Sequence, residues 1–136
     1  MPVNLDIDKR NENIKIYING SFYKREEAKI SVFDSGFLLG DGIWEGIRLV
    51  NNEWLFLDEH LERLFEGCRA IDIDINMSFN DIKKAIHDTQ KINDMDGSAH
   101  ARLMITRGDK IKPFQQPSLS NKGIKNKDDL AELAVD

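Results

Sequence analysis

The chain has 136 residues, of which 40% are hydrophobic and 32% are charged, and its formal net charge at pH 7 is -5. This length supports one hydrophobic core, and the acidic balance excludes a protein that holds nucleic acid through phosphate contacts. No apolar run approaches the roughly 20 residues of a membrane span, and we expect no secretory signal. The single cysteine, Cys68, excludes an internal disulfide and favours a reducing, cytoplasmic location.

Residues 1–13 are polar and irregular, and we expect them to form an N-terminal tail. The alternation of apolar and polar residues over 14–18 predicts a half-buried strand. Asn19-Gly20 then supplies the two positive-φ residues of a type I′ turn, and residues 21–24 are the expected returning strand.

The next segment is rich in glycine. Four glycines fall within eleven positions, so its backbone must bend sharply or approach other chain segments closely: Gly36, Gly40, Gly42 and Gly46. Asp41, Trp44 and Glu45 lie between them, and such residues suit the lining of a cleft. A hairpin over 45–57 follows, with its turn at Asn51-Asn52.

Two helices are predicted after this hairpin. The first covers 58–70, with Asp58 as its N-cap and with Leu61, Leu64 and Cys68 on one buried stripe. Arg63 lies off that stripe, and His60 precedes it by one turn. A capping box from Ser78 to Asp81 opens the second helix, over 79–93.

A strand over 99–106 completes the expected domain. From residue 109 the chain is polar, and we expect a flexible tail over 109–136, with at most one short amphipathic helix over 128–134. The predicted class is therefore α+β: a small domain over 14–108 whose antiparallel sheet is packed by two helices.

Three arginines are the main candidates for ligand binding in this sequence. Arg63 and His60 suit the binding of a phosphate or carboxylate, because guanidinium donates paired hydrogen bonds to such anions; the alternative is a solvated surface arginine. Arg48 and Arg102 stand in otherwise apolar strands, where they face either solvent or a cleft. Glu45 is a candidate acid or base without a partner carboxylate.

Three segments, 34–48, 57–64 and 101–108, resemble the amino-terminal domain of the class IV, fold-type IV pyridoxal-phosphate enzymes. This family contains the branched-chain aminotransferases, the D-amino-acid transaminases and aminodeoxychorismate lyase. The resemblance implies a small α+β domain that packs against a larger one, with the cofactor between them and the subunits paired as dimers.

The resemblance also implies roles for particular residues. Arg63 matches the arginine that contacts the cofactor phosphate. Leu39, Trp44, Arg48 and Arg102 fall where the branched-chain enzymes keep substrate-pocket residues, although Leu39 replaces a tyrosine that several members carry. The run from Glu45 to Arg48 is typical of the branched-chain subgroup, whose reaction transfers an amino group between an amino acid and 2-oxoglutarate.

The family's catalytic lysine lies in its second domain, and the chain has no lysine in the expected surroundings. The lysines of the polar segment are Lys110, Lys112, Lys122, Lys125 and Lys127. A lysine nucleophile needs a shell that lowers its pKa and orients it. We therefore expect a truncated chain that is inactive alone and does not bind pyridoxal phosphate by itself. The alternatives are a non-catalytic self-association module, or part of a D-amino-acid transaminase or of the lyase.

Overall fold

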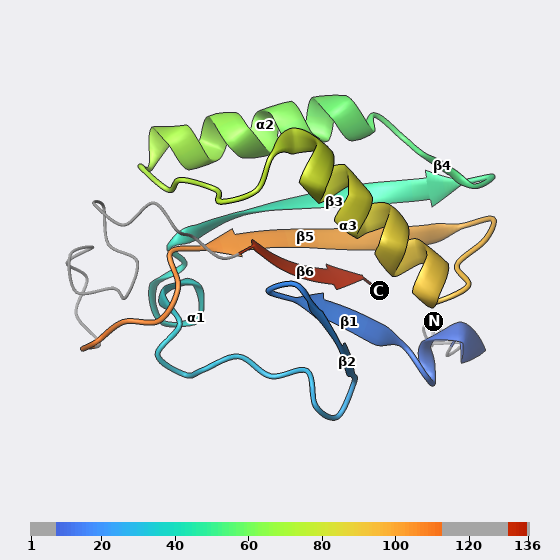
Figure 1. Cartoon of the computed structure of the whole chain (residues 1–136), viewed down its shortest axis with the longest axis horizontal. Coiled ribbons are helices and arrows are strands. Elements are labelled where there is room, and N and C mark those ends of the chain that lie inside the picture. The colour runs from blue at the N-terminus through green and yellow to red at the C-terminus, as the bar shows by residue number, and fades with distance from the viewer. Residues whose placement is uncertain (1–7, 113–130, 136) are drawn as a thin grey trace, which may run out of the picture.

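The structure is a computed structural model that describes residues 8–112 and 131–135. Its strands form one antiparallel sheet in the order β2-β1-β6-β5-β3-β4, and α2 and α3 lie on one face of it (Figure 1). The elements are η1 (Lys9–Asn11), β1 (Lys15–Ile18), β2 (Ser21–Lys24), α1 (Ser35–Leu39), β3 (Gly42–Val50), β4 (Glu53–Trp54), α2 (Leu57–Ala70), α3 (Phe79–Ile92), β5 (Ala99–Thr106) and β6 (Ala131–Val135). The predicted α+β class is confirmed.

Both hairpin turns use left-handed residues, as the sequence predicts. Asn19 and Gly20 have φ values of 50° and 91°, and Ile18 pairs with Ser21 across the turn. Asn51 and Asn52, with φ of 50° and 63°, turn the chain from β3 into β4. β4 ends at Trp54, three residues before the end of the predicted hairpin over 45–57, and the chain then leaves the sheet.

The pairing of β3 with β5 forms the central part of the sheet and extends over eight residue pairs. Along β3 the side chains alternate between the two faces. Glu45, Ile47 and Leu49 are buried on the face that carries the helices, whereas Trp44 and Arg48 are exposed on the other face. β3 therefore contributes side chains to both faces of the sheet, and candidate site residues lie on each face.

The helix α2 begins one residue earlier than predicted, and the assignment of Asp58 as its N-cap is wrong. The N-cap is Phe56, which has φ 53° and caps the helix with no side-chain hydrogen bond. Asp58 pairs instead with Lys83 of α3, at 2.9 Å. The predicted buried stripe is confirmed, because Leu61, Leu64 and Cys68 are at most 1% exposed.

The helix α3 starts at the predicted capping box: the Ser78 hydroxyl accepts from the Asp81 amide, and the Asp81 carboxylate accepts from the Ser78 amide. Ile82 and Ile86 are fully buried against the sheet. At the end of α3, the Asn93 side chain accepts from the Lys15 amide and donates to its carbonyl, which holds β1 against the helix.

The C-terminal helix predicted over 128–134 is wrong where the structure describes it, because residues 131–135 form β6 in the middle of the sheet. A helix of so few residues is not stable by itself, whereas β1 and β5 offer backbone groups for pairing on both sides. The rest of the predicted tails, 1–7, 113–130 and 136, lies outside the described residues. None of the helices in the described part of the chain has the length and apolar character that a bilayer crossing needs.

Candidate functional site

Arg63 is held by Glu45 in a paired contact between α2 and β3. The Arg63 Nε and Nη2 atoms donate to the two carboxylate oxygens of Glu45, each over 2.6 Å. The Nδ1 atom of His60 lies 2.8 Å from one of these oxygens. His60 and Arg63 meet the same carboxylate because residues three apart lie on the same side of a helix.

The burial of these three side chains is unequal. Glu45 is 3% exposed, His60 is 22% exposed and Arg63 is 69% exposed. The buried carboxylate therefore fixes the guanidinium from the protein side, while the remaining N–H groups of Arg63 stay available to an anion from solvent.

The hydrogen bonds from Arg63 hold the pKa of Glu45 below its ordinary value of 4.5, against the opposing effect of burial, and His60 adds to the decrease. The same contact raises the pKa of Arg63. Glu45 is thus an ionised acceptor at neutral pH. The lowered pKa and the two engaged oxygens make Glu45 a weak proton donor, and its interpretation as an acid or base stays a prediction.

On the opposite face of the sheet, Trp44 and Arg102 are brought together. The guanidinium carbon of Arg102 lies 5.4 Å from the centroid of the Trp44 ring, a cation–π contact between β3 and β5. Trp44 is 62% exposed, so the ring presents apolar surface beside a positive charge. This combination suits a ligand with an apolar part and an anionic part.

Arg48 lies further along the same face, opposite His100 in the strand register. Both residues line a hollow of about 270 Å³, which also includes Arg10 from η1. A Cβ at Gly46 would lie 3.1 Å from the His100 Nε2, so the imidazole would have to shift slightly to admit a side chain there. No sequence signal indicated a role for His100, since strand alternation alone gives an isolated histidine no role.

Leu39 ends α1 and is 37% exposed. Its neighbour Gly40 closes the helix with φ 66°, a left-handed conformation that favours glycine. At the start of α1, Asp34 is 2% exposed and accepts hydrogen bonds from the Gly36 amide and the Thr106 hydroxyl. The helix that carries Leu39 is thereby fixed to the end of β5.

Arg107 is a second residue that sequence analysis missed. It is 3% exposed and donates to the Asp41 carboxylate at 2.8 Å and to the carbonyl of Ile71 at 2.5 Å. It therefore connects the glycine-rich loop to the end of α2. Arg-Gly at the end of a predicted strand resembles an ordinary exposed turn, so no sequence signal distinguished it.

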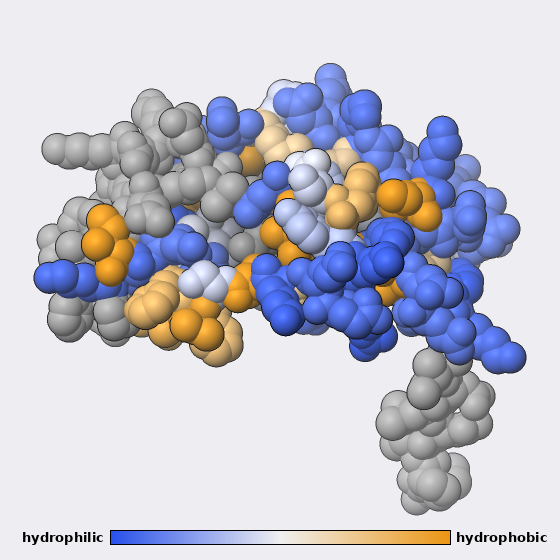
Figure 2. All heavy atoms as spheres, turned by 60° about the horizontal axis from the view of Figure 1, so that its bottom comes forward, coloured by the Kyte–Doolittle hydropathy of each residue, from blue (hydrophilic) through white to orange (hydrophobic). Residues whose placement is uncertain are grey.

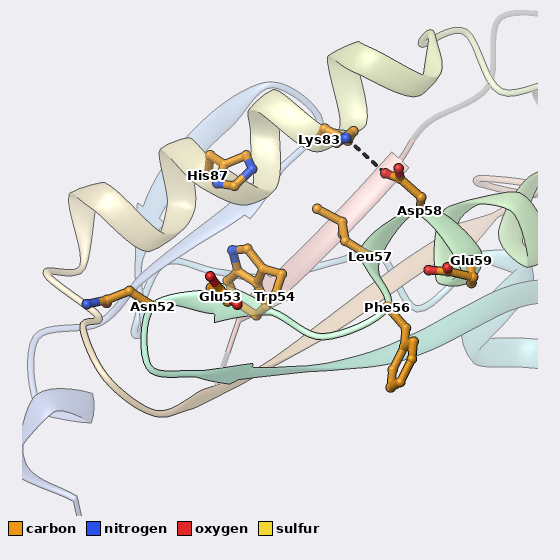
Figure 3. A pocket seen from close by; sticks show the side chains of 9 residues that line it. All are labelled: Asn52, Glu53, Trp54, Phe56, Leu57, Asp58, Glu59, Lys83 and His87. Carbon is orange, nitrogen blue, oxygen red and sulfur yellow. Dashed lines mark hydrogen bonds and ion pairs between the residues drawn. The ribbon is translucent and has the colours of Figure 1, made fainter.

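Another hollow lies between the β3–β4 hairpin and α3 and measures about 520 Å³ (Figure 3). Its charged lining is mostly acidic, with Glu53, Asp58 and Glu59, and its one lysine, Lys83, already pairs with Asp58. This lining is unsuited to a phosphate, and the hollow contains none of the residues that the sequence indicated as a site.

Among the predicted site residues, Arg63 therefore meets the requirements of a phosphate contact. Its guanidinium is exposed, its orientation is fixed by two hydrogen bonds to Glu45, and its unused N–H donors match the geometry of phosphate oxygens. The pyridoxal phosphate that the sequence resemblance implies thus fits the donor group that the structure presents. Trp44 and Arg102, on the opposite face of the sheet, fit the requirements of a substrate contact.

Residues 42–123 match the family described as amino-transferase class IV. The match covers more than half of the chain, so the chain belongs to the class IV aminotransferase family, as its motifs indicate.

Similar proteins agree with this membership. The chain is 39% identical over 95 residues to a putative branched-chain-amino-acid aminotransferase of Methanocaldococcus jannaschii, covering 70% of this chain and 33% of that protein. It is 37% identical over 100 residues to aminodeoxychorismate lyase of Bacillus subtilis, covering 73% and 34%. The chain thus spans about a third of the length of these curated relatives.

The fold is also found among solved structures. The branched-chain amino acid aminotransferase of Escherichia coli superposes with a TM-score of 0.75 at 21% identity, covering 92% of this chain and 41% of that one. A branched-chain amino acid aminotransferase solved with pyridoxamine 5′-phosphate superposes with a TM-score of 0.74 at 23% identity, covering 91% and 39%. These similarities establish the fold of the described domain.

Proposed function

We propose that the chain is the cofactor-flanking small domain of a pyridoxal-phosphate-dependent aminotransferase. Its reaction transfers an amino group between a branched-chain amino acid and 2-oxoglutarate. The observation that carries the proposal is the exposed guanidinium of Arg63, fixed by two hydrogen bonds to the buried Glu45. Part of a D-amino-acid transaminase or of aminodeoxychorismate lyase is the alternative within the family.

Each candidate residue has a binding role in this proposal. Arg63 binds the cofactor phosphate, and Glu45 sets the plane of its guanidinium. Leu39, Trp44, Arg48 and Arg102 line the substrate pocket, where the arginines attract carboxylates and the tryptophan ring contacts the apolar side chain. When bound, the cofactor supplies the electron sink that amino-group transfer requires.

We further propose that the chain is inactive alone and, in place of the expected lack of binding, that Arg63 gives it a weak, non-covalent affinity for the cofactor. The family's covalent lysine belongs to a second domain, and the matched relatives are about three times as long as this chain. A phosphate contact by one arginine orients the cofactor but provides no covalent attachment and no enclosing wall.

The test is a titration with pyridoxal phosphate, followed by borohydride trapping and mass spectrometry. We expect weak binding that is lost in Arg63→Gln, with no trapped adduct on any unique lysine and no transamination of leucine with 2-oxoglutarate. A stoichiometric adduct on one lysine, with turnover that disappears when that lysine is replaced, would contradict the proposed inactivity.

A second candidate function is self-association, and exposed apolar side chains around α1 favour it. Hydrophobic residues gather at the end of the molecule where α1 lies (Figure 2). This α1 surface consists of Ile30, Val32, Phe33, Phe37, Leu38, Leu39 and Ile111, which are 36–67% exposed. Exposed clusters of this kind commonly mark contacts between proteins.

Self-association through the α1 surface predicts a dimer in the micromolar range. Sedimentation velocity at increasing concentration measures it, and Phe37→Asp should shift the chain to monomer. Ile92→Asp is the matched control, since Ile92 is 46% exposed on α3, outside the surface. A monomer at all concentrations would count against this candidate.

A further inference from the structure

The sheet has an unusual dependence on its last strand. β6 lies between β1 and β5, and it is the strand, among the described residues, that pairs with both of them. β1 and β5 do not neighbour each other, so the space that separates them is one strand wide, roughly 9–10 Å. Without β6, the β1–β2 hairpin would lose its backbone link to the rest of the sheet, and both neighbouring edges would be open.

We call the space between β1 and β5 the slot, and β6 pairs more extensively with one side of it than with the other. β6 pairs with β5 over five residue pairs, from Ala101↔Val135 to Ile105↔Ala131. It pairs with β1 over two residue pairs, Tyr17↔Leu133 and Ile18↔Glu132. The β5 edge is therefore the main template for the incoming strand, and its pairing depends on backbone groups that any extended segment provides.

β6 is also the last strand of the chain, separated from Lys112 by 18 residues, and it lies beyond residue 123, where the family match ends. The β5 edge that receives it belongs to the matched region. The slot thus has one wall, β5, inside the family match, whereas its other wall, β1, and its occupant, β6, lie outside the match. A connection of 18 residues is long enough to carry β6 to the same slot of a neighbouring molecule.

From these observations we infer that the slot between β1 and β5 is a strand-addition site that also accepts β6 from a second copy of the chain. Exchange of an identical element keeps every backbone hydrogen bond of the sheet, so it is a low-cost route to a dimer. The partner is a second copy of this chain, joined through the sheet itself. This contact is distinct from the α1 surface and does not depend on the aminotransferase proposal.

Cysteine cross-linking of the full chain tests the inference. Met104 and Glu132 are direct register partners, so the double variant M104C/E132C reports β6 in the slot of its own chain. Chains carrying only M104C and only E132C are then mixed, unfolded in urea and refolded together. A disulfide between them requires that the strand of one chain enters the other. Lys84→Cys, on the exposed side of α3, replaces M104C in the control for random collision.

We expect the double variant to cross-link within one chain, and the mixture of M104C with E132C to give about tenfold more heterodimer than the collision control. Peptide mapping confirms that the bridge joins residues 104 and 132 and excludes Cys68. An internal cross-link in the double variant without heterodimer above the control would overturn the inference. Failure of the double variant to cross-link would overturn it as well, because β6 would then not occupy the slot.

Discussion

Trp44 and Glu45 are adjacent in β3, yet their side chains leave opposite faces of the sheet, with 62% and 3% exposure. Glu45 meets α2 on the helix-covered face, and Trp44 meets Arg102 on the other. β3 therefore carries residues of both the proposed phosphate contact and the proposed substrate surface. A mutation of Glu45 tests the phosphate contact, and a mutation of Trp44 tests the substrate surface.

The Glu45–Arg63 contact predicts a pH dependence of stability. The lowered pKa of Glu45 means that the unfolded chain binds its proton more tightly than the folded chain. This contribution to the unfolding free energy is complete above the unfolded pKa and is lost as the pH falls through the lowered folded pKa. We expect E45Q to be less stable than the wild type by about 1–3 kcal/mol near neutral pH.

Urea unfolding of both proteins between about pH 7 and pH 3 measures this effect. The difference between them should narrow as the pH falls, because the wild-type carboxylate becomes protonated. A difference that stays constant over the whole range would mean that Glu45 acts by packing alone.

The contact of the buried Arg107 with the half-buried Asp41 predicts a larger loss of stability. Arg107→Met leaves the Asp41 carboxylate and the Ile71 carbonyl without their donor, so the unfolding free energy should fall by about 3–5 kcal/mol. The matched control is Lys84→Met, which removes a surface pair with Asp88 and should cost under about 1 kcal/mol. Equal effects of the two variants in urea unfolding would contradict the structural role of Arg107.

The close approach of β3 to β5 at Gly42 predicts sensitivity to a single methyl group. A Cβ at this position would lie 2.5 Å from the Ile105 carbonyl oxygen, which is backbone and cannot move aside. Gly42→Ala should lower the unfolding free energy by about 1–3 kcal/mol.

Gly67→Ala provides the comparison for Gly42→Ala. Its Cβ would meet the Ile43 side chain at 3.1 Å, which can adjust, and alanine favours the helix. We therefore expect a change close to zero in thermal unfolding. A harmless Gly42→Ala would show that the two strands are further apart than the structure has them.

Local sequence signals predicted the elements that depend on local chemistry. Asn19-Gly20 located the first hairpin, and the Ser78–Asp81 capping box located the start of α3. The N-cap of α2 was wrong, because Asp58 is used by Lys83 of another helix. β6 was missed for a similar reason: a tertiary slot, and not local propensity, decides its conformation.

In the candidate site, too, the sequence predicted individual residues but not the tertiary contacts between them. The sequence indicated Arg63 and Trp44 as site residues. It could not show that Glu45 is the buried partner of Arg63, or that His100 lies beside Arg48, because these contacts depend on how the strands and helices pack. Glu45 was considered without a partner, whereas two residues of α2 contact it. Arg107 was not recognised, since its acceptors, Asp41 and Ile71, are far from it in the chain.

The most direct test of the account is whether Arg63 binds a phosphate carried by the cofactor. NMR of the arginine side chains during titration with pyridoxamine 5′-phosphate, and separately with pyridoxamine, isolates the phosphate contribution. We predict that the Arg63 Nε signal shifts with the phosphorylated compound and not with pyridoxamine, and that E45Q weakens this response. An unchanged Arg63 signal, in a folded chain that binds the compound elsewhere, would contradict the proposed cofactor-flanking role.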